Sequence, residues 1–85
     1  MEAYTTLKYP VSTEKTIRLM ESENKMVFVI DRNADKKDVA KAFQETFGAM
    51  PISVNTLIRG KKKLAYITLG PEKPAIEIAT QMGLM

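Results

Sequence analysis

Four cationic side chains crowd into the five-residue run RGKKK at positions 59–63. Clustered lysine and arginine neutralise phosphate charge, and their local density, more than the net charge of +3, sets the potential that a phosphate experiences. A solvated turn is the ordinary alternative, because exposed loops also collect lysine. The candidate phosphate-binding residues of this run are Arg59, Lys61, Lys62 and Lys63.

Asn55, a few residues earlier, is a second candidate, because asparagine is depleted in the interiors of strands. Residues alternate between two faces over 52–59, which places Asn55 on one face of a strand together with Ser53 and Arg59. An amide, a hydroxyl and a guanidinium in a row can meet phosphates, riboses and base edges. An edge strand with polar residues facing solvent explains the same pattern without a ligand, so both interpretations stay open.

Lys36 and Lys37 stand in the first turn of an expected helix, where free backbone amides attract anions. Lysine is electrostatically mismatched to this end of a helix dipole. A phosphate held between the amides and these two side chains is therefore a hypothesis for both residues. Plain solvent exposure explains either lysine equally well.

The sequence offers few groups suited to catalysis. It contains no histidine and no cysteine, which removes the commonest general base, the commonest thiol nucleophile, most zinc ligands and any disulfide. Asp31 and Asp35 could join a magnesium site, but no neighbouring residue has ligand spacing. The four glycines stand at expected turns or helix ends, and no glycine-rich phosphate loop is present. We expect a binding protein without enzyme activity, cofactor, metal or small-molecule substrate.

The length of 85 residues allows one domain, 1–85, with a single core. Apolar residues make up 45% of the chain, which is enough for that core. No apolar run approaches the ~18 residues of a membrane span, and the N-terminus lacks a basic region followed by an apolar one. We therefore expect a cytoplasmic protein that does not span a membrane.

The elements that must position these candidates follow the order β-α-β-α-β-β-α. Strands are predicted over 5–9, 25–31, 52–59 and 63–69, and helices over 12–23, 36–47 and 74–82. Thr13 and Asp35 are the expected N-caps, and Gly48 ends the second helix. The apolar run at 25–31 predicts a central strand covered on both faces. This order predicts an α+β sandwich with helices packed on a mainly antiparallel four-stranded sheet.

Tyr66 lies in a run that partly matches the strand of RNA-recognition motif domains. Ala65, Tyr66 and Ile67 fit that motif, but Leu64 and Leu69 stand where its aromatic residues should be. The order of strands and helices is also wrong for that fold. We expect Tyr66 to be a packing residue with a hydrated hydroxyl.

Five features in order resemble one family over almost the whole chain. They are YPVSTEK at 9–15, NKMVFVID at 24–31, Lys37, VNT at 54–56 and KLAYITL at 63–69. Together they resemble the large-subunit ribosomal protein numbered twenty-three. The resemblance implies a structural protein that binds the third domain of large-subunit ribosomal RNA at the rim of the peptide exit tunnel. It also implies ribosomal protein number twenty-nine as a neighbour and the signal recognition particle as a docking factor.

The resemblance assigns roles to individual residues. Thr13 and Lys15 fall in the T-E-K motif, which implies RNA contact, and Lys37 and Asn55 match a basic position and the V-N-T motif. Glu14 matches an acidic residue that faces docking factors in bacterial members, and it is also favoured by the dipole of a helix N-terminus.

The connection between the last two strands departs from bacterial members. They carry a long basic extension there, whereas this chain has only about 59–63, as in archaeal members. The short form argues against a sensor inside the tunnel. The resemblance to archaeal members argues against docking of the chaperone trigger factor, because archaea are expected to lack it. The alternative function is a small RNA-binding or protein-interaction module outside the ribosome.

Overall fold

The computed structural model describes residues 6–72 and 74–83, which form seven elements in the predicted order. The strands are β1 (Leu7–Pro10), β2 (Lys25–Ile30), β3 (Ser53–Arg59) and β4 (Lys62–Thr68). The helices are α2 (Glu14–Glu23), α3 (Lys36–Phe47) and α4 (Ala75–Gln81). The strands form one sheet in the order β1-β2-β4-β3, and every neighbouring pair is antiparallel. The predicted α+β fold is confirmed.

The end of β1 differs from the prediction for a physical reason. The sequence predicts that Pro10 ends this strand, whereas Pro10 is its last residue and pairs with Phe28. β1 is an edge strand, where proline's missing amide need not remove a ladder hydrogen bond. Val11 then donates its amide to the carbonyl oxygen of Val27 at 2.8 Å. Thr5, where the strand is predicted to begin, lies outside the described residues.

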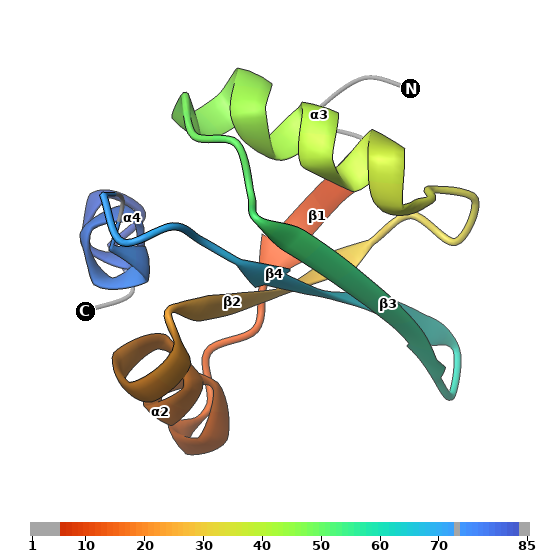
Figure 1. The fold of residues 1–85 in the computed structure, drawn as a ribbon. Helices are drawn as coiled ribbons and strands as arrows, with labels where there is room; N and C mark the ends of the chain where they lie inside the picture. Colours follow the sequence, from red (N-terminus) through yellow and green to blue (C-terminus); the bar gives the residue numbers. More distant parts are fainter. Residues whose placement is uncertain (1–5, 73, 84–85) are drawn as a thin grey trace.

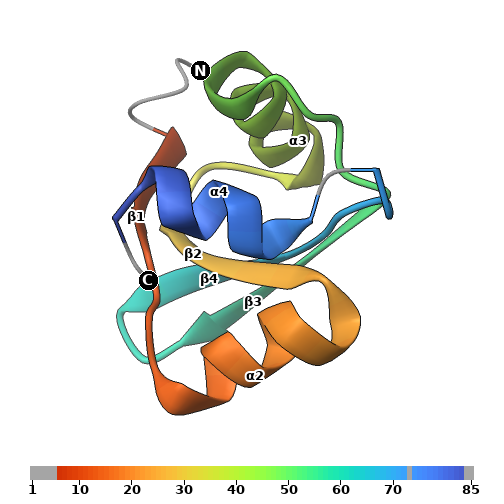
Figure 2. The same cartoon turned by 90° about the vertical axis from the view of Figure 1, so that its left-hand side faces the viewer.

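All three helices pack on the same face of the sheet (Figures 1 and 2). Figure 2 shows α4 and α2 in front of the strands, with α3 above them. Phe28 of β2 meets Phe43 of α3 edge to face, with ring centroids 6.1 Å apart. The sheet and helix residues of this core are Met20, Met26, Phe28, Ile30, Val39, Phe43, Ala65, Ile67, Ala75, Ile78 and Ala79.

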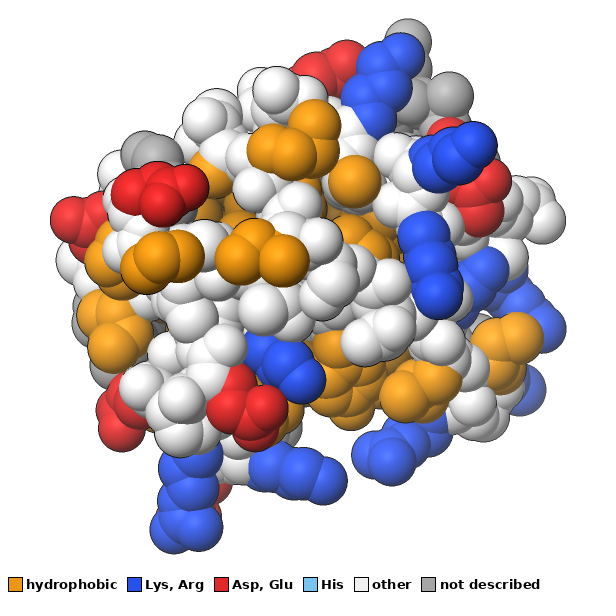
Figure 3. All heavy atoms as spheres, viewed as in Figure 1, with side chains coloured by type: hydrophobic (Ala, Val, Ile, Leu, Met, Phe, Trp, Pro, Cys, Tyr) orange, Lys and Arg blue, Asp and Glu red, His pale blue; other side chains and the backbone are white. Residues whose placement is uncertain are grey.

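The opposite face of the sheet, hereafter the outer face, carries no helix from residues 6–72 and 74–83. Val27 and Val29 of β2 point to it, yet they are only 3% and 5% exposed. Both stand outside the core cluster, and their register partners on the flanking strands are Tyr66 for Val27 and Leu64 and Tyr9 for Val29. The prediction of a central strand with two buried faces is confirmed, although helices cover only one. Figure 3 shows lysine and arginine gathered at the right of the molecule, where the β3–β4 turn lies in Figure 1.

Both predicted N-caps are confirmed. The Asp35 carboxylate accepts the amide of Asp38 at 2.8 Å, and the Asp38 carboxylate accepts the amide of Asp35, which forms a capping box at the start of α3. The hydrogen bond from the Asp38 amide lowers the pKa of Asp35 below its ordinary value. Gly48 ends α3 in the left-handed conformation, with φ of 71°. The start and end of α3 are thus set by local sequence.

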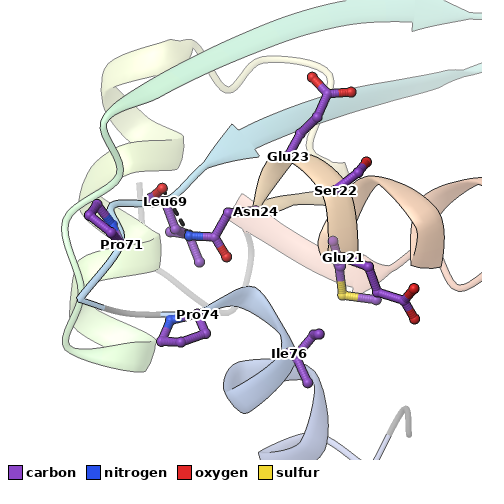
Figure 4. Close-up of a pocket in the computed structure, with 9 residues that line it drawn as sticks. Glu21, Ser22, Glu23, Asn24, Leu69, Pro71, Pro74 and Ile76 are labelled. Atoms are coloured by element: carbon purple, nitrogen blue, oxygen red, sulfur yellow. Dashed lines mark hydrogen bonds between the residues drawn. The ribbon is translucent and has the colours of Figure 1, made fainter.

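Asn24, at the end of α2, bonds two segments that lie 45 to 51 residues further along the chain, the end of β4 and the start of α4. It ends α2 in the left-handed region, with φ of 56°, and its side-chain amide donates to the carbonyl oxygens of Leu69 and Gly70, both at 3.0 Å. Its side-chain oxygen accepts the amide of Ala75 at 2.6 Å, which anchors the first residue of α4. Figure 4 shows the Asn24 side chain turned from the end of α2 toward Leu69. No local sequence pattern predicts this bridge, because it joins residues 45 to 51 positions apart.

Replacing Asn24 tests the bridge. Asn24→Ala should lower the free energy of unfolding by about 2–4 kcal/mol, because it removes the three side-chain hydrogen bonds described above and replaces asparagine, which tolerates the left-handed region, by alanine, which tolerates it less well. Asn24→Gly loses the same bonds without the backbone strain, so its loss should be smaller by about 1 kcal/mol. Urea denaturation measures both.

Asn33→Ala, at an exposed turn position, is the matched control and should stay within about 0.5 kcal/mol of the unmodified protein. An equally small effect of Asn24→Ala would show that the bridge contributes nothing to stability.

Candidate nucleic-acid interface

The outer face of β3 and β4 presents four cross-strand pairs in rows. Ala65 and Ile67 of β4 are fully buried in the core, so the residues that alternate with them point outward. From the open end of the hairpin to its turn, the outward pairs are Ser53 with Thr68, Asn55 with Tyr66, Leu57 with Leu64, and Arg59 with Lys62. Along this row the first pair carries two hydroxyls, the second an amide and a phenol ring, the third two leucine side chains and the last two cations.

Three of the four predicted cations of the 59–63 run are exposed at the hairpin turn. Arg59 and Lys62 form the last pair of the two strands, and Lys61 lies in the turn. The Lys62 ammonium lies 5.7 Å from the centroid of the Tyr9 ring, across the outer face on β1. These cations lie beyond the Leu57–Leu64 pair at the end of the hairpin whose outer face carries Asn55, so one hairpin presents four of the predicted contacts.

Lys63 occupies a different position. It pairs with Ile58 and Ile30, which places it on the helix-covered side of the sheet, and it is half-buried. Its ammonium donates to the carbonyl oxygens of Ala34, at 2.7 Å, and Arg32, at 3.5 Å. Lys63 thus fastens the loop before α3 to the hairpin. An RNA contact by Lys63 stays a prediction, but the structure gives this side chain another partner.

The same loop brings the start of α3 to the basic end of the molecule. Lys36 and Lys37 are exposed in the first turn of α3, two and three residues after the Ala34 carbonyl that Lys63 holds. Arg32, which was not among the predicted contacts, is exposed in the same loop, between the end of β2 and the start of α3. Its position directly after the central strand was the available signal. One end of the molecule therefore carries cations from both the hairpin and the α3 loop.

The T-E-K residues belong to a separate element, the start of α2. The Thr13 hydroxyl accepts the amide of Thr16 at 3.3 Å and so has a structural role as N-cap. Glu14 is exposed and forms an ion pair with Arg18 at 2.7 Å. Lys15 is exposed, which leaves it accessible to a partner.

A cleft of about 460 Å³ between α2 and α4 is a poor candidate for phosphate. Its lining includes the exposed side chains of Glu21 and Glu23 (Figure 4) and the buried side chains of Met20 and Leu69. Carboxylates repel phosphate, so this cleft and the cationic end are electrostatically opposite. Within residues 6–72 and 74–83, no group of acidic side chains could hold a metal ion, and no helix is long and apolar enough to cross a membrane.

Comparison with known proteins identifies the family. The sequence model of the family described as Ribosomal protein L23 matches residues 5–75. The chain belongs to the ribosomal protein L23 family. It is 44% identical to the large ribosomal subunit protein uL23 of Methanococcus maripaludis strain C6 and 46% identical to that of Methanococcus aeolicus, in each case over 86 residues that cover 99% of both chains.

Membership of the L23 family confirms the resemblance based on the five ordered features. The family consists of ribosomal proteins and not of enzymes, which accords with a sequence poor in catalytic groups. The relatives come from archaea, and the two-residue turn between β3 and β4 agrees with the compact archaeal form.

Lys62 and Lys63 are neighbours in sequence with different roles, which substitution can separate. Lys63→Met should lower the free energy of unfolding by about 1–2 kcal/mol, because it removes the charged donor to the Ala34 carbonyl. Lys62→Met, on the exposed outer face, should change it by no more than about 0.5 kcal/mol. Urea denaturation of the two variants side by side measures the difference, and equal stabilities would contradict a structural role for Lys63.

Proposed function

We propose that the chain is a structural protein of the cytoplasmic large ribosomal subunit that binds large-subunit ribosomal RNA through its outer face. Support for the subunit comes from relatives named as large ribosomal subunit proteins that align over 99% of their length. Support for the surface comes from one observation. The face of β3 and β4 that no described helix covers carries Asn55 and, beyond the Leu57–Leu64 pair, Arg59 and Lys62 next to the basic turn.

The chemistry of this row suits folded RNA. Arg59, Lys61 and Lys62 provide charge for phosphates, and Asn55 and Ser53 provide neutral donors and acceptors for riboses and base edges. Lys36 and Lys37 extend the cationic surface across the end of the sheet, and Thr13 and Lys15 add a contact from α2. Phosphate contacts would position the protein, and the shape of the RNA would supply most of the specificity.

The finer placement within the subunit follows the family resemblance. We place the single domain, 1–85, on the third domain of large-subunit RNA at the rim of the exit tunnel, beside ribosomal protein number twenty-nine. The signal recognition particle is the proposed docking factor, with Glu14 as its contact. The exposure of the Glu14 carboxylate at the start of α2 supports this role.

RNA selectivity across a salt series tests the proposal. The purified chain should bind a fragment of large-subunit RNA domain three much more tightly than an unrelated folded RNA of equal length. The double substitution Lys61→Ala with Lys62→Ala should reduce the slope of log affinity against log salt by roughly 1.4–1.8, because two phosphate contacts are lost. Filter binding or fluorescence anisotropy measures both quantities.

Lys41→Ala is the single-charge comparison, because Lys41 is exposed on α3 one turn beyond Lys37 and is not among the proposed contacts. Its slope should equal that of the unmodified protein. Equal affinity for the two RNAs would favour a general RNA-binding module outside the ribosome, and an unchanged slope in the double variant would mean that the turn is only solvated.

A further inference from the structure

Tyr66 occupies the middle of the outer face. Its neighbours in sequence, Ala65 and Ile67, are fully buried on the helix side, so the Tyr66 side chain projects from the opposite side. Its register partners are Val27 on β2 and Asn55 on β3. The ring is therefore flanked by an aliphatic side chain on the sheet interior and by an amide on the edge strand.

The burial of Val27 bears on the position of its neighbour Tyr66. Val27 is only 3% exposed although no described helix lies on its face. Tyr66 is the large side chain directly opposite Val27 in the register, and it is itself half-buried. Tyr66 is thus placed to cover Val27, and the part of its ring that stays exposed adds apolar surface to the outer face. We call this ring the platform, because it lies partly exposed on the outer face and not in the helix-covered core.

Asn55 stands beside this platform with an available amide. Directly opposed residues in antiparallel strands have β-carbons about 4.5–5.5 Å apart, which brings Asn55 within reach of anything stacked on Tyr66. Asn55 is exposed, and its side chain has no hydrogen-bond partner among the described residues. It can therefore offer both a donor and an acceptor to the edge of a flat ligand.

The cations lie too far along the strands to serve the same nucleotide. Arg59 is four residues beyond Asn55, or about 13 Å along the strand. The Leu57–Leu64 pair separates the two sets, and Leu57 is 38% exposed. Phosphates at the hairpin turn would thus belong to nucleotides neighbouring the one that reaches Tyr66.

We propose that Tyr66 and Asn55 form a binding site for one unstacked RNA base, which stacks on the Tyr66 ring while the Asn55 amide bonds its edge. A base is the flat ligand that matches a half-buried ring, a neighbouring amide and cations one step away. This inference rests on the proposed RNA-binding function. It revises the role expected for Tyr66 from the sequence, where only packing was predicted.

Tryptophan fluorescence provides the direct test, because the chain contains no tryptophan. Tyr66→Trp introduces a single reporter at the platform. Titration with the fragment of large-subunit RNA domain three should quench its emission, because a stacked base contacts the indole. A variant with the reporter in the helix layer, Phe47→Trp, should retain its emission in the same titration.

Affinity separates stacking from simple packing. Tyr66→Phe keeps the ring and should bind the same RNA within roughly twofold of the unmodified protein. Tyr66→Leu still covers Val27 but offers no π-face, and it should bind roughly 5- to 150-fold more weakly. Because no charge changes, the salt slope should be the same in both variants. Urea denaturation of both confirms that each is folded at the assay temperature.

The outcomes distinguish this site from the wider function. If the unmodified protein selects the domain three fragment but Tyr66→Leu binds it equally well and Tyr66→Trp is not quenched, the base site is wrong and RNA binding through the cations stands. If the unmodified protein shows no selectivity, the proposed function itself fails. Quenching together with weakened binding by Tyr66→Leu and retained binding by Tyr66→Phe supports the base site.

Discussion

The one-sided burial of β4 is the constraint on which the rest of the structure depends. Ala65 and Ile67 are fully buried against the helices, and β4 lies between β2 and β3 in the sheet. Strand geometry then sends Tyr66 and Leu64 to the outer face, and antiparallel pairing sets Asn55 opposite Tyr66. A shift of the β3–β4 register by one residue would turn Asn55 and Arg59 toward the core. The candidate interface therefore follows from the packing of the core and from a turn short enough to hold the register.

The lysines at the basic end of the molecule have two different roles, one structural and one proposed for RNA binding. Lys62 and Lys63 are adjacent, but alternation sends the first to the outer face and the second to the carbonyl of Ala34. The Lys63 contact also fixes the loop that leads to Lys36 and Lys37. Lys63 thus helps to hold in place the loop that carries the cations at the start of α3. The carboxylates of Glu21 and Glu23 lie at the cleft between α2 and α4, away from this basic end.

Local patterns in the sequence were sufficient to predict most of the fold. The caps at Thr13 and Asp35 and the stop at Gly48 depend on a few neighbouring residues, and each was predictable for that reason. The alternation of β3 likewise predicted that Asn55 and Arg59 share a face. Which face the helices cover depends on how the whole chain folds, and the position of Tyr66 followed from that choice. The Asn24 bridge and the Lys63 contact join residues 29 to 51 positions apart, and no local pattern encodes such pairs.

Protection of side chains on binding RNA tests the central claim, that the outer face is the RNA interface. Leu57 on the outer face and Ile76 on α4 are each 38% exposed, which makes them a matched pair for hydroxyl-radical footprinting read by mass spectrometry. In the complex with the domain three fragment, oxidation of Leu57 should fall strongly while that of Ile76 stays as in the free protein. Protection of Ile76 with Leu57 unchanged would place the RNA on the helix layer and contradict the claim.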